Sequence, residues 1–385
     1  MPYRVHLEER PAGFAAASSK DGDKIPIIYR EFTSSEDGEK FISRLDGTPA
    51  KILTLLESST SIRASTVDHL IALIQQDGTT DVYINEANFL GKARLLKVVK
   101  QGDPILDVDI VDIEELWIED VEFPQDVGII FLFSQGWRKG LFFDFGPLLP
   151  APVLRQYAVP KLFANLFNYL TFQQYFRLSD EDWNKLFAAS WFPFIGIGKD
   201  ALRDLLTRVR EGWNTDELVD LIAERMKARL PVQRQLWNSY EALKPHAQFL
   251  DHAIDRFVHG DSISAVSILF PRIEGLLREL QVKLGSRSFK QIDLAGAPHT
   301  THTSWSSANS RLLPLRFKQY LENVFFASFT PGVTPTLSRN SVAHGVAPAS
   351  LFSVKSAVIG FLVIEQLCYH LPPSKDETSP PPSEA

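Results

Sequence analysis

Apolar residues between about 80 and 147 follow the pattern of β-strands. The segment "ILDVDIVDIEELWI" (105–118) nearly alternates apolar residues with carboxylates, as expected for a strand with one face in a core. In "GIIFLFSQGWRKGLFFDFG" (128–146), two apolar and aromatic runs flank a turn rich in serine and glycine, which predicts a hairpin. We therefore predict a sheet of several antiparallel strands in this part of the chain.

A different spacing precedes these strands. In "STVDHLIALIQQDG" (65–78), Val67, Leu70, Ile71 and Ile74 recur at helical intervals. The pattern predicts a helix, with Ser65 as its N-cap and Gly78 as its terminator. Together with the strands, this helix predicts an α+β domain over residues 1–150.

Beyond the proline-rich segment "PLLPAPVLRQYAVP" (147–160), the pattern is helical almost to the end of the chain. We expect a helical middle region over 151–240. One of its helices, in "SDEDWNKLFAASWF", has Ser179 as N-cap and carboxylates in its first turn. Other helices are expected in "KLFANLFNYLTFQQYFRL", "KDALRDLLTRVREGW" and "TDELVDLIAERMKARL".

Residues 241–371 predict an all-α bundle. Its second helix, "DSISAVSILFPRIEGLLRELQVKLG", is capped by Asp261, and Pro271 predicts a kink or a break between two helices. A polar stretch at 285–310 interrupts the helical pattern, and we interpret it as a substrate loop or a disordered segment. Further helices are expected in "PHAQFLDHAIDRFVHG", in "LLPLRFKQYLENVFFASF" and from about Ser350 to His370, before a Pro- and Ser-rich tail (372–385) that is expected to be disordered.

The composition excludes several classes of protein. A single cysteine, Cys368, excludes an intrachain disulfide and suits a reducing cytosol. The charged N-terminal sequence argues against export, and the apolar segment 356–371 is short for a membrane span and contains Glu365. We therefore expect a cytoplasmic protein without a membrane segment, in which 356–371 is a buried helix.

The net charge of −7 is unevenly distributed. Residues 1–240 hold 27 basic and 35 acidic residues, whereas residues 241–371 hold 12 basic and 9 acidic ones. The C-terminal bundle is therefore modestly basic, by three charges. A domain that binds a polyanion has this balance, although many other domains share it.

The stretch "SRNSVAHG" (338–345) gathers a cation, an amide, hydroxyls and an imidazole. Five helical residues place Arg339 and His344 about 140° apart with a rise of about 7.5 Å, so one helix cannot bring the two side chains together. Asn340 and His344 share a face. A site here requires a second element or a second copy of the chain. The alternative is a capped helix end, with Ser338 as N-cap, Arg339 and Asn340 solvated, and His344 near the C-terminus, where the helix dipole favours a cation.

The chemistry that suits these residues is cleavage of an RNA phosphodiester without a metal. Histidine can act as base or acid near neutral pH, and arginine binds phosphate oxygens through paired hydrogen bonds. His299 and His302 lack further zinc ligands nearby, so we predict no metal site. The chain also lacks a phosphate-binding loop, a dinucleotide-binding loop and a Gly-x-Ser-x-Gly elbow, and we predict no cofactor.

"SRNSVAHG" resembles the Arg-x4-6-His motif of the HEPN superfamily, including the polar residue after the arginine. Upstream, "DSISAVSILFPRIEGLLREL" is similar to the second-helix signature of a large prokaryotic HEPN group, Pro-x-Ile-Glu-x-x-x-Arg, through Pro271, Ile273, Glu274 and Arg278. The resemblance covers about 240–371. It implies an α+β protein that ends in a HEPN-type helical bundle.

The resemblance also implies a function. Arg339 and His344 would be the catalytic pair and Asn340 an accessory residue, in a metal-independent endoribonuclease whose composite site forms in a homodimer. RNA would be the substrate, in prokaryotic anti-phage defence or a toxin system. From the arrangement of the domains, and not from the resemblance, we expect 1–150 to sense a phage-derived or nucleic-acid trigger or to hold the nuclease in check.

Two alternatives belong to other classes of protein. The bundle can be an inactive HEPN scaffold that binds RNA, a nucleotide or a protein, or the N-terminal sheet can be the interacting part while the helices dimerise. Glu274 and Arg278 also leave two interpretations open. Their i, i+4 spacing suits a surface ion pair, and it equally suits support for Arg339 or a substrate phosphate.

Overall fold

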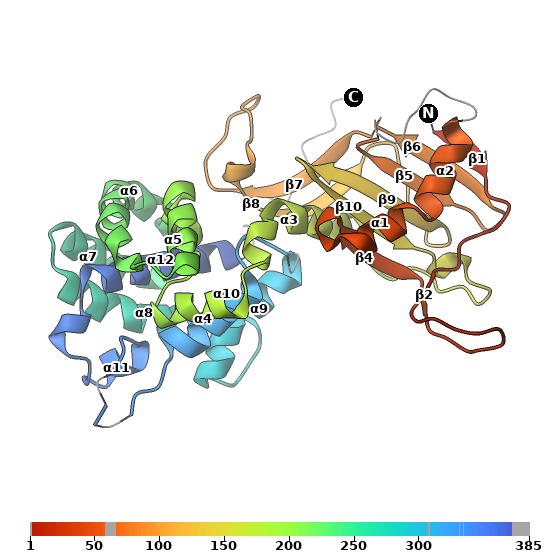
Figure 1. Cartoon of the computed structure of the whole chain (residues 1–385). Coiled ribbons are helices and arrows are strands. Elements are labelled where there is room, and N and C mark those ends of the chain that lie inside the picture. The colour runs from red at the N-terminus through yellow and green to blue at the C-terminus, as the bar shows by residue number, and fades with distance from the viewer. Residues whose placement is uncertain are drawn as a thin grey trace. The chain divides into compact units, whose positions relative to one another are not determined.

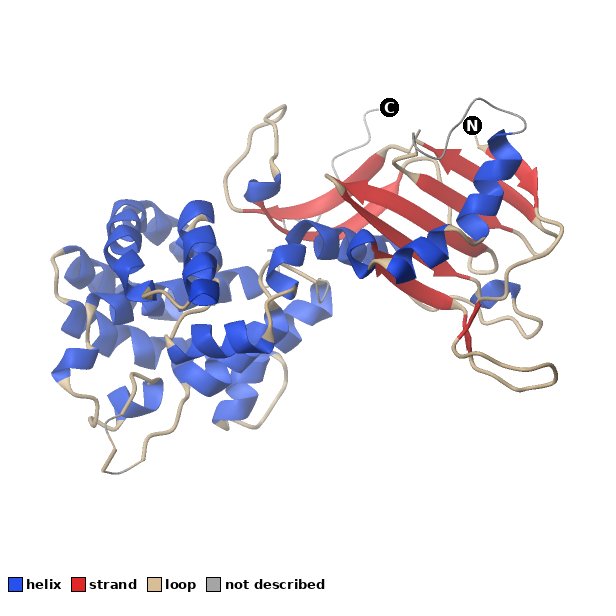
Figure 2. Cartoon of the chain, viewed as in Figure 1, coloured by secondary structure: helices blue, strands red, loops and turns tan. Residues whose placement is uncertain are grey.

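The computed structural model describes residues 2–57, 67–85, 87–306, 309–330, 332–333 and 335–371. It divides into two compact units. Met1–Arg94 and Ile113–Gln173 form the first, which we call the sheet unit, and Leu95–Asp112 and Gln174–Ala385 form the second, the helical unit. The predicted α+β class, with an N-terminal sheet and a C-terminal helical region, is confirmed (Figures 1 and 2). The expected disordered tail, 372–385, lies outside the described residues.

The sheet unit is built on a six-stranded antiparallel sheet of order β1-β6-β5-β9-β10-β4. The predicted hairpin is confirmed as β9 and β10, where Arg138 pairs with Gln135 across a turn in which Gly136 has φ 61°. The strands are β1 (Tyr3–His6), β4 (Arg30–Ser34), β5 (Leu70–Ile74), β6 (Thr79–Ile84), β9 (Gly128–Gln135) and β10 (Arg138–Asp144). Two short ribbons pair β2 (Phe14–Ala15) with β3 (Ile27–Ile28) and β7 (Phe89–Leu95) with β8 (Ile110–Ile118).

The helix predicted over 65–78 is wrong. Leu70–Ile74 is the strand β5, which pairs with both β6 and β9, and all five of its residues are buried. Its continuous apolar run fits a central strand covered on both faces as well as it fits one side of a helix. Gly78 ends the turn of the β5–β6 hairpin with φ 89°, and the predicted cap Ser65 lies outside the described residues.

Helices cover both faces of the sheet. Residues of α1 (Glu39–Leu45) and α2 (Thr48–Glu57), including Phe41 and Ile52, pack against one face. The other face packs against α3 (Val159–Phe176), where Phe131 of β9 stacks on Phe163 with ring centroids 4.1 Å apart. This double cover explains why β5 and β9 lack an alternating pattern.

The helical unit contains α4 to α12, and the predicted caps Ser179 and Asp261 each accept a backbone N–H at the start of their helices. The helices are α4 (Asp180–Ala188), α5 (Lys199–Glu211), α6 (Val219–Ser239), α7 (Ala247–Val258), α8 (Ser262–Lys283), α9 (Gln291–Trp305), α10 (Pro314–Tyr320), α11 (Arg339–Ala343) and α12 (Val354–His370). After α10 the chain continues as a π-helical turn, Leu321–Phe325.

Two expectations for this unit are corrected. Helix α8 continues through Pro271, so a break between two helices, one of the two expected alternatives, is wrong, and Leu269 and Phe270 before the proline and Ile273 after it are all buried. Tertiary packing on both sides therefore overrides the local cost of proline. Within the polar stretch at 285–310, which was expected to be a substrate loop or disordered, residues 291–305 form α9. Its buried Leu294 and Ala295 provide the apolar face that the composition obscured.

Helix α12 is buried as predicted, with Ser356–His370 all shielded from solvent. Glu365 lies within it, and Arg229 of α6 binds both carboxylate oxygens at 2.8 and 2.6 Å. Burial raises the pKa of Glu365, and the Arg229 guanidinium opposes that rise. Within the described part of the chain, no helix is long and apolar enough to cross a membrane.

Candidate functional site

The predicted site residues lie on two helices of the helical unit and at the end of one of them. Glu274 and Arg278 are one turn apart on α8, and Arg339 and Asn340 begin α11. His344 is the C-cap of α11.

Helix α11 is only five residues long and depends on its caps. Ser338 accepts the backbone N–H of Ser341 at 3.1 Å, as the sequence predicted for an N-cap. In return, the Ser341 hydroxyl accepts the N–H of Ser338 at 2.9 Å and also lies 2.9 Å from the carbonyl of Thr336. Both serines are buried, and Gly345 leaves the helix with φ 68°. The caps therefore fix where α11 begins and ends.

Asn340 is buried and bound inside the protein. Its amide donates to the carbonyl of Phe326 at 2.8 Å, and it exchanges two hydrogen bonds with the side-chain amide of Gln291, at 2.5 and 3.1 Å. Only 6% of Asn340 is exposed. This residue anchors α11 to α9 and to the end of the π-helical turn, and it does not face solvent as a substrate-binding residue would.

Glu274 connects both predicted arginines. Its side chain is 6% exposed, and its two oxygens bind different partners. Oε1 accepts from Nε and Nη2 of Arg278 at 2.8 and 2.6 Å, whereas Oε2 forms an ion pair with Nε of Arg339. One buried carboxylate therefore holds two guanidinium groups, so the interpretation of Glu274 as a support for Arg339 fits this geometry better than a surface pair.

One edge of the Arg339 guanidinium stays open to solvent. Its side chain is 23% exposed, Nη1 lies 3.4 Å from the oxygen of Asn340, and Nη2 makes no hydrogen bond within the described residues. Burial lowers the pKa of Arg339, but an arginine remains charged near neutral pH. With one buried carboxylate shared between two arginines, this cluster carries a net positive charge beside an open guanidinium edge.

His344 lies apart from that cluster. It is exposed at the C-terminal end of α11, and its ring packs near Phe329 with centroids 5.6 Å apart. Among the described residues, neither a hydrogen bond nor an ion pair joins His344 to Arg339. The helix argument from the sequence therefore holds in the folded chain, since one copy presents the two residues at different ends of α11.

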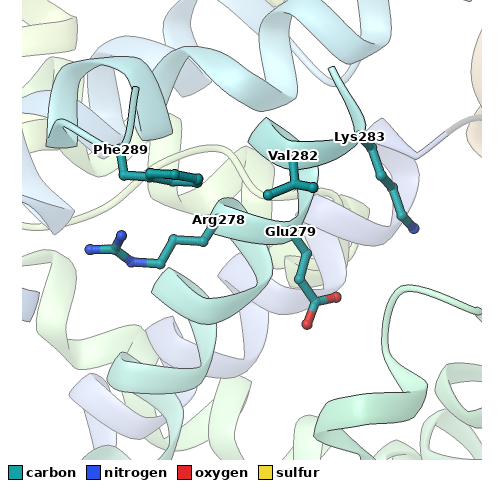
Figure 3. A pocket seen from close by; sticks show the side chains of 5 residues that line it. All are labelled: Arg278, Glu279, Val282, Lys283 and Phe289. Carbon is teal, nitrogen blue, oxygen red and sulfur yellow. The ribbon is translucent and has the colours of Figure 1, made fainter. Parts of the chain in front are cut away.

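A surface pocket adjoins the arginine cluster (Figure 3). Its volume is about 430 Å³, and Phe289 comes from the segment between α8 and α9 while the other lining residues lie on the last turns of α8. The guanidinium of Arg278 lies over the Phe289 ring, 5.6 Å from its centroid. The lining residues are Arg278, Glu279, Val282, Lys283 and Phe289.

The histidine pair considered for zinc lies on α9. His302 is fully buried, with Nε2 3.4 Å from Asp112 and its ring 5.3 Å from that of His370. Ser306 also donates to Asp112. The described residues include no group of three or more histidine, cysteine or acidic side chains arranged to hold a metal ion. His302 therefore belongs to a buried polar cluster and not to the polar loop that the sequence suggested.

Sequence reasoning missed two residues of this region. Gln291 pairs with Asn340, and Phe289 completes the pocket, but both fall in or beside the stretch interpreted as a loop. The sequence over 291–305 has no clear helical period, so nothing local to Gln291 placed it on a helix. Nothing local to Phe289 indicated that it would lie beside Arg278.

Comparisons with protein-family models, with curated proteins and with solved structures found no match to this chain.

Proposed function

We propose that this protein is a metal-independent endoribonuclease, and that its helical unit is a HEPN-type bundle that works as a homodimer. The observation that carries the proposal is the way in which the Arg339 guanidinium is held. A buried carboxylate, Glu274, fixes its Nε side, and its Nη2 edge is left without a protein partner among the described residues. An arginine held in this way is oriented to bind a phosphate oxygen.

The reaction explains why two copies are needed. A base must remove the proton of the ribose 2′-hydroxyl, the leaving 5′-oxygen must receive a proton, and a cation must hold the phosphate meanwhile. Each chain offers one exposed histidine in the motif, His344. In a two-fold dimer, Arg339 of one copy binds the phosphate while His344 of the other copy takes the 2′ proton and, once protonated, gives it to the leaving oxygen.

The bonds balance without a metal or a cofactor. The 2′-oxygen forms a bond to phosphorus, and the bond from phosphorus to the 5′-oxygen breaks. Arg339 stabilises the charge that develops on the phosphate oxygens. The products are a 2′,3′-cyclic phosphate and a 5′-hydroxyl, which distinguish this reaction from metal-dependent hydrolysis.

A second candidate function is a helical scaffold without catalysis. Asn340 is buried in hydrogen bonds to Gln291 and Phe326, and Arg339 binds a buried carboxylate. Two of the three motif residues thus have partners that explain their presence structurally. On this account, the same bundle binds RNA, a nucleotide or a protein, and the exposed His344 has no chemical role.

The two functions are separated by RNA cleavage in excess chelator. Wild-type protein is expected to release fragments with 2′,3′-cyclic phosphate ends, and Arg339→Ala and His344→Ala are each expected to lower the rate by at least about a hundredfold. Arg272→Ala and His259→Ala, which change the same residue types on α8 and at the end of α7, are the matched controls and should cut normally. If the wild type leaves every RNA intact, or if all five proteins cut equally, the catalytic assignment is wrong.

A further inference from the structure

The segment that forms the pocket beside Arg278 is strongly basic. Between positions 278 and 290 the chain has four cationic residues and one acidic residue. The cationic ones are Arg278, Lys283, Arg287 and Lys290, and all four are exposed. The acidic one, Glu279, is already engaged, because His246 Nε2 lies 3.0 Å from its carboxylate. The segment therefore carries three more cationic than acidic residues, and its one carboxylate, Glu279, lies in the pocket wall.

The pocket also presents an aromatic face. Phe289 is 39% exposed, and Arg278 approaches its ring from one side (Figure 3). The remaining lining residues are Val282, Lys283 and Glu279. Positive charge around an exposed aromatic ring is the arrangement by which proteins bind single-stranded nucleic acids, since bases stack on the ring and cations hold the backbone.

The pocket is connected to the candidate catalytic arginine, Arg339, through Glu274. Arg278 and Arg339 bind the two oxygens of the same carboxylate, Glu274. The pocket therefore lies one shared carboxylate away from the arginine proposed to bind the phosphate.

We propose that this pocket holds one unpaired base of the RNA strand, stacked on Phe289, while Arg278 and Lys283 bind the flanking phosphates. The inference rests on the proposed ribonuclease function and adds a selectivity to it. A base within a duplex is stacked on both sides and cannot enter the pocket, so the protein recognises single-stranded RNA or a looped-out base.

The test measures binding of an RNA that cannot be cleaved. The probe is a single-stranded 2′-O-methyl oligonucleotide containing 2-aminopurine, whose fluorescence falls when the base stacks. Full-length wild-type protein is expected to bind it with quenching. Phe289→Ala should weaken binding about tenfold and remove the quenching, whereas Phe289→Trp should retain both. The matched control is Phe249→Ala, because Phe249 is 44% exposed on α7 and Arg272 lies over its ring at 4.1 Å.

Several outcomes overturn the proposal. It is wrong if wild type does not bind the single strand, or if Phe289→Ala binds it as tightly as wild type. It is also wrong if Phe289→Ala weakens binding of duplex RNA as much as binding of the single strand. It is also wrong if Phe289→Ala changes the oligomeric state in sedimentation, since a second copy would then cover the pocket.

The outcome is independent of catalysis. If the strand binds and is quenched through Phe289 but natural RNA is never cleaved, the ribonuclease proposal fails and the pocket stands. If natural RNA is cleaved but Phe289→Ala binds normally, only the pocket proposal fails.

Discussion

At the scale of single residues, Glu274 is the side chain on which the candidate site depends. It is almost fully buried, and its carboxylate contacts both Arg278 and Arg339. A buried charge of this kind stabilises the fold only while its partners remain, because an unpartnered ion in the interior costs several kcal/mol.

We predict that Glu274→Gln lowers both stability and cleavage. The amide keeps the shape of the side chain but removes the charge that orients Arg339, so unfolding should become easier by about 2–4 kcal/mol and cleavage slower by at least about tenfold. Urea denaturation and the cleavage rate in chelator measure the two effects. Glu224→Gln, which changes an exposed glutamate on α6 that pairs with Lys227, is the control and should change cleavage little. A Glu274→Gln protein as active as wild type would contradict the role given to this carboxylate.

His69 makes the sheet unit sensitive to acid. Burial lowers the pKa of its imidazole, Lys139 lowers it further and Asp68 partly opposes both. Because the folded pKa lies below the ordinary value of 6.5, the unfolded chain binds more protons as the pH falls below that value. The stability contributed by neutral His69 is therefore complete above pH 6.5 and is lost as the pH falls through the lowered pKa.

We predict that the melting temperature of the wild type falls between pH 7.5 and about 5.5, and that His69→Gln removes part of that fall. Calorimetry at a series of pH values measures it, with the exposed His252→Gln as control. If the melting temperatures of wild type and His69→Gln fall in parallel with pH, the His69 imidazole does not cause the loss of stability.

At the scale of elements, the close contact between α8 and α12 depends on a missing side chain. A Cβ on Gly360 of α12 would lie 2.9 Å from Cδ1 and 3.2 Å from Cβ of Leu269, which is fully buried on α8. Gly296, within α9, differs, because a Cβ there would meet only the stem of Lys318 at 3.8 Å.

Opposite effects of the same substitution are therefore expected. Gly360→Ala should destabilise the protein by about 1–3 kcal/mol, because the Leu269 side chain has no space to move into. Gly296→Ala should be neutral or stabilise it by up to about 1 kcal/mol through helix propensity. Chemical denaturation compares the two variants, and equal effects of the same sign would refute this account of the contact.

The elements also show what the sequence alone can predict. Helix starts were predictable where the cap is local, as at Ser179, Asp261 and Ser338, because the capping hydrogen bond spans only three residues. The strand Leu70–Ile74 was not predictable, because its conformation depends on pairing with the strands β6 and β9 on either side. Local spacing cannot reveal partners that are distant in the chain.

In the candidate site too, local features could be predicted from the sequence and long-range contacts could not. The i, i+4 pair Glu274 and Arg278 could be predicted from one helix, and so could the separation of Arg339 from His344. The hydrogen bonds between Asn340 and Gln291 could not, because they join positions 49 residues apart through a helix that the polar composition hid. This long-range contact changes Asn340 from an expected accessory residue into a buried anchor.

At the scale of the whole molecule, the two units do not follow the order of the chain. Leu95–Asp112 comes from the middle of the sheet unit's sequence but belongs to the helical unit. Val111 is fully buried there with Leu312, and its carbonyl accepts the N–H of Arg311 at 3.2 Å. The helical unit is therefore incomplete without residues from the N-terminal part of the chain.

We predict that deleting residues 1–150 impairs the folding of the helical unit as well as removing the sheet. The deletion leaves a cavity at Val111, removes the buried Asp112 from His302 and Ser306, and exposes the face of α3 that packed on the sheet. Circular dichroism and calorimetry of the truncated chain should show lost helicity and no cooperative transition. A truncated chain that retains the helical signal and a sharp transition would contradict this prediction.

The central claim is that a metal-free ribonuclease site takes Arg339 from one copy of the chain and His344 from another. It is tested most directly by mixing Arg339→Ala and His344→Ala proteins, each inactive alone, under conditions that allow subunits to exchange, and measuring RNA cleavage in chelator. Half of the dimers are then mixed and have one intact site of two, so activity should return to about a quarter of the wild-type value. If the mixture stays as inactive as its components while sedimentation shows mixed dimers, the shared site is contradicted.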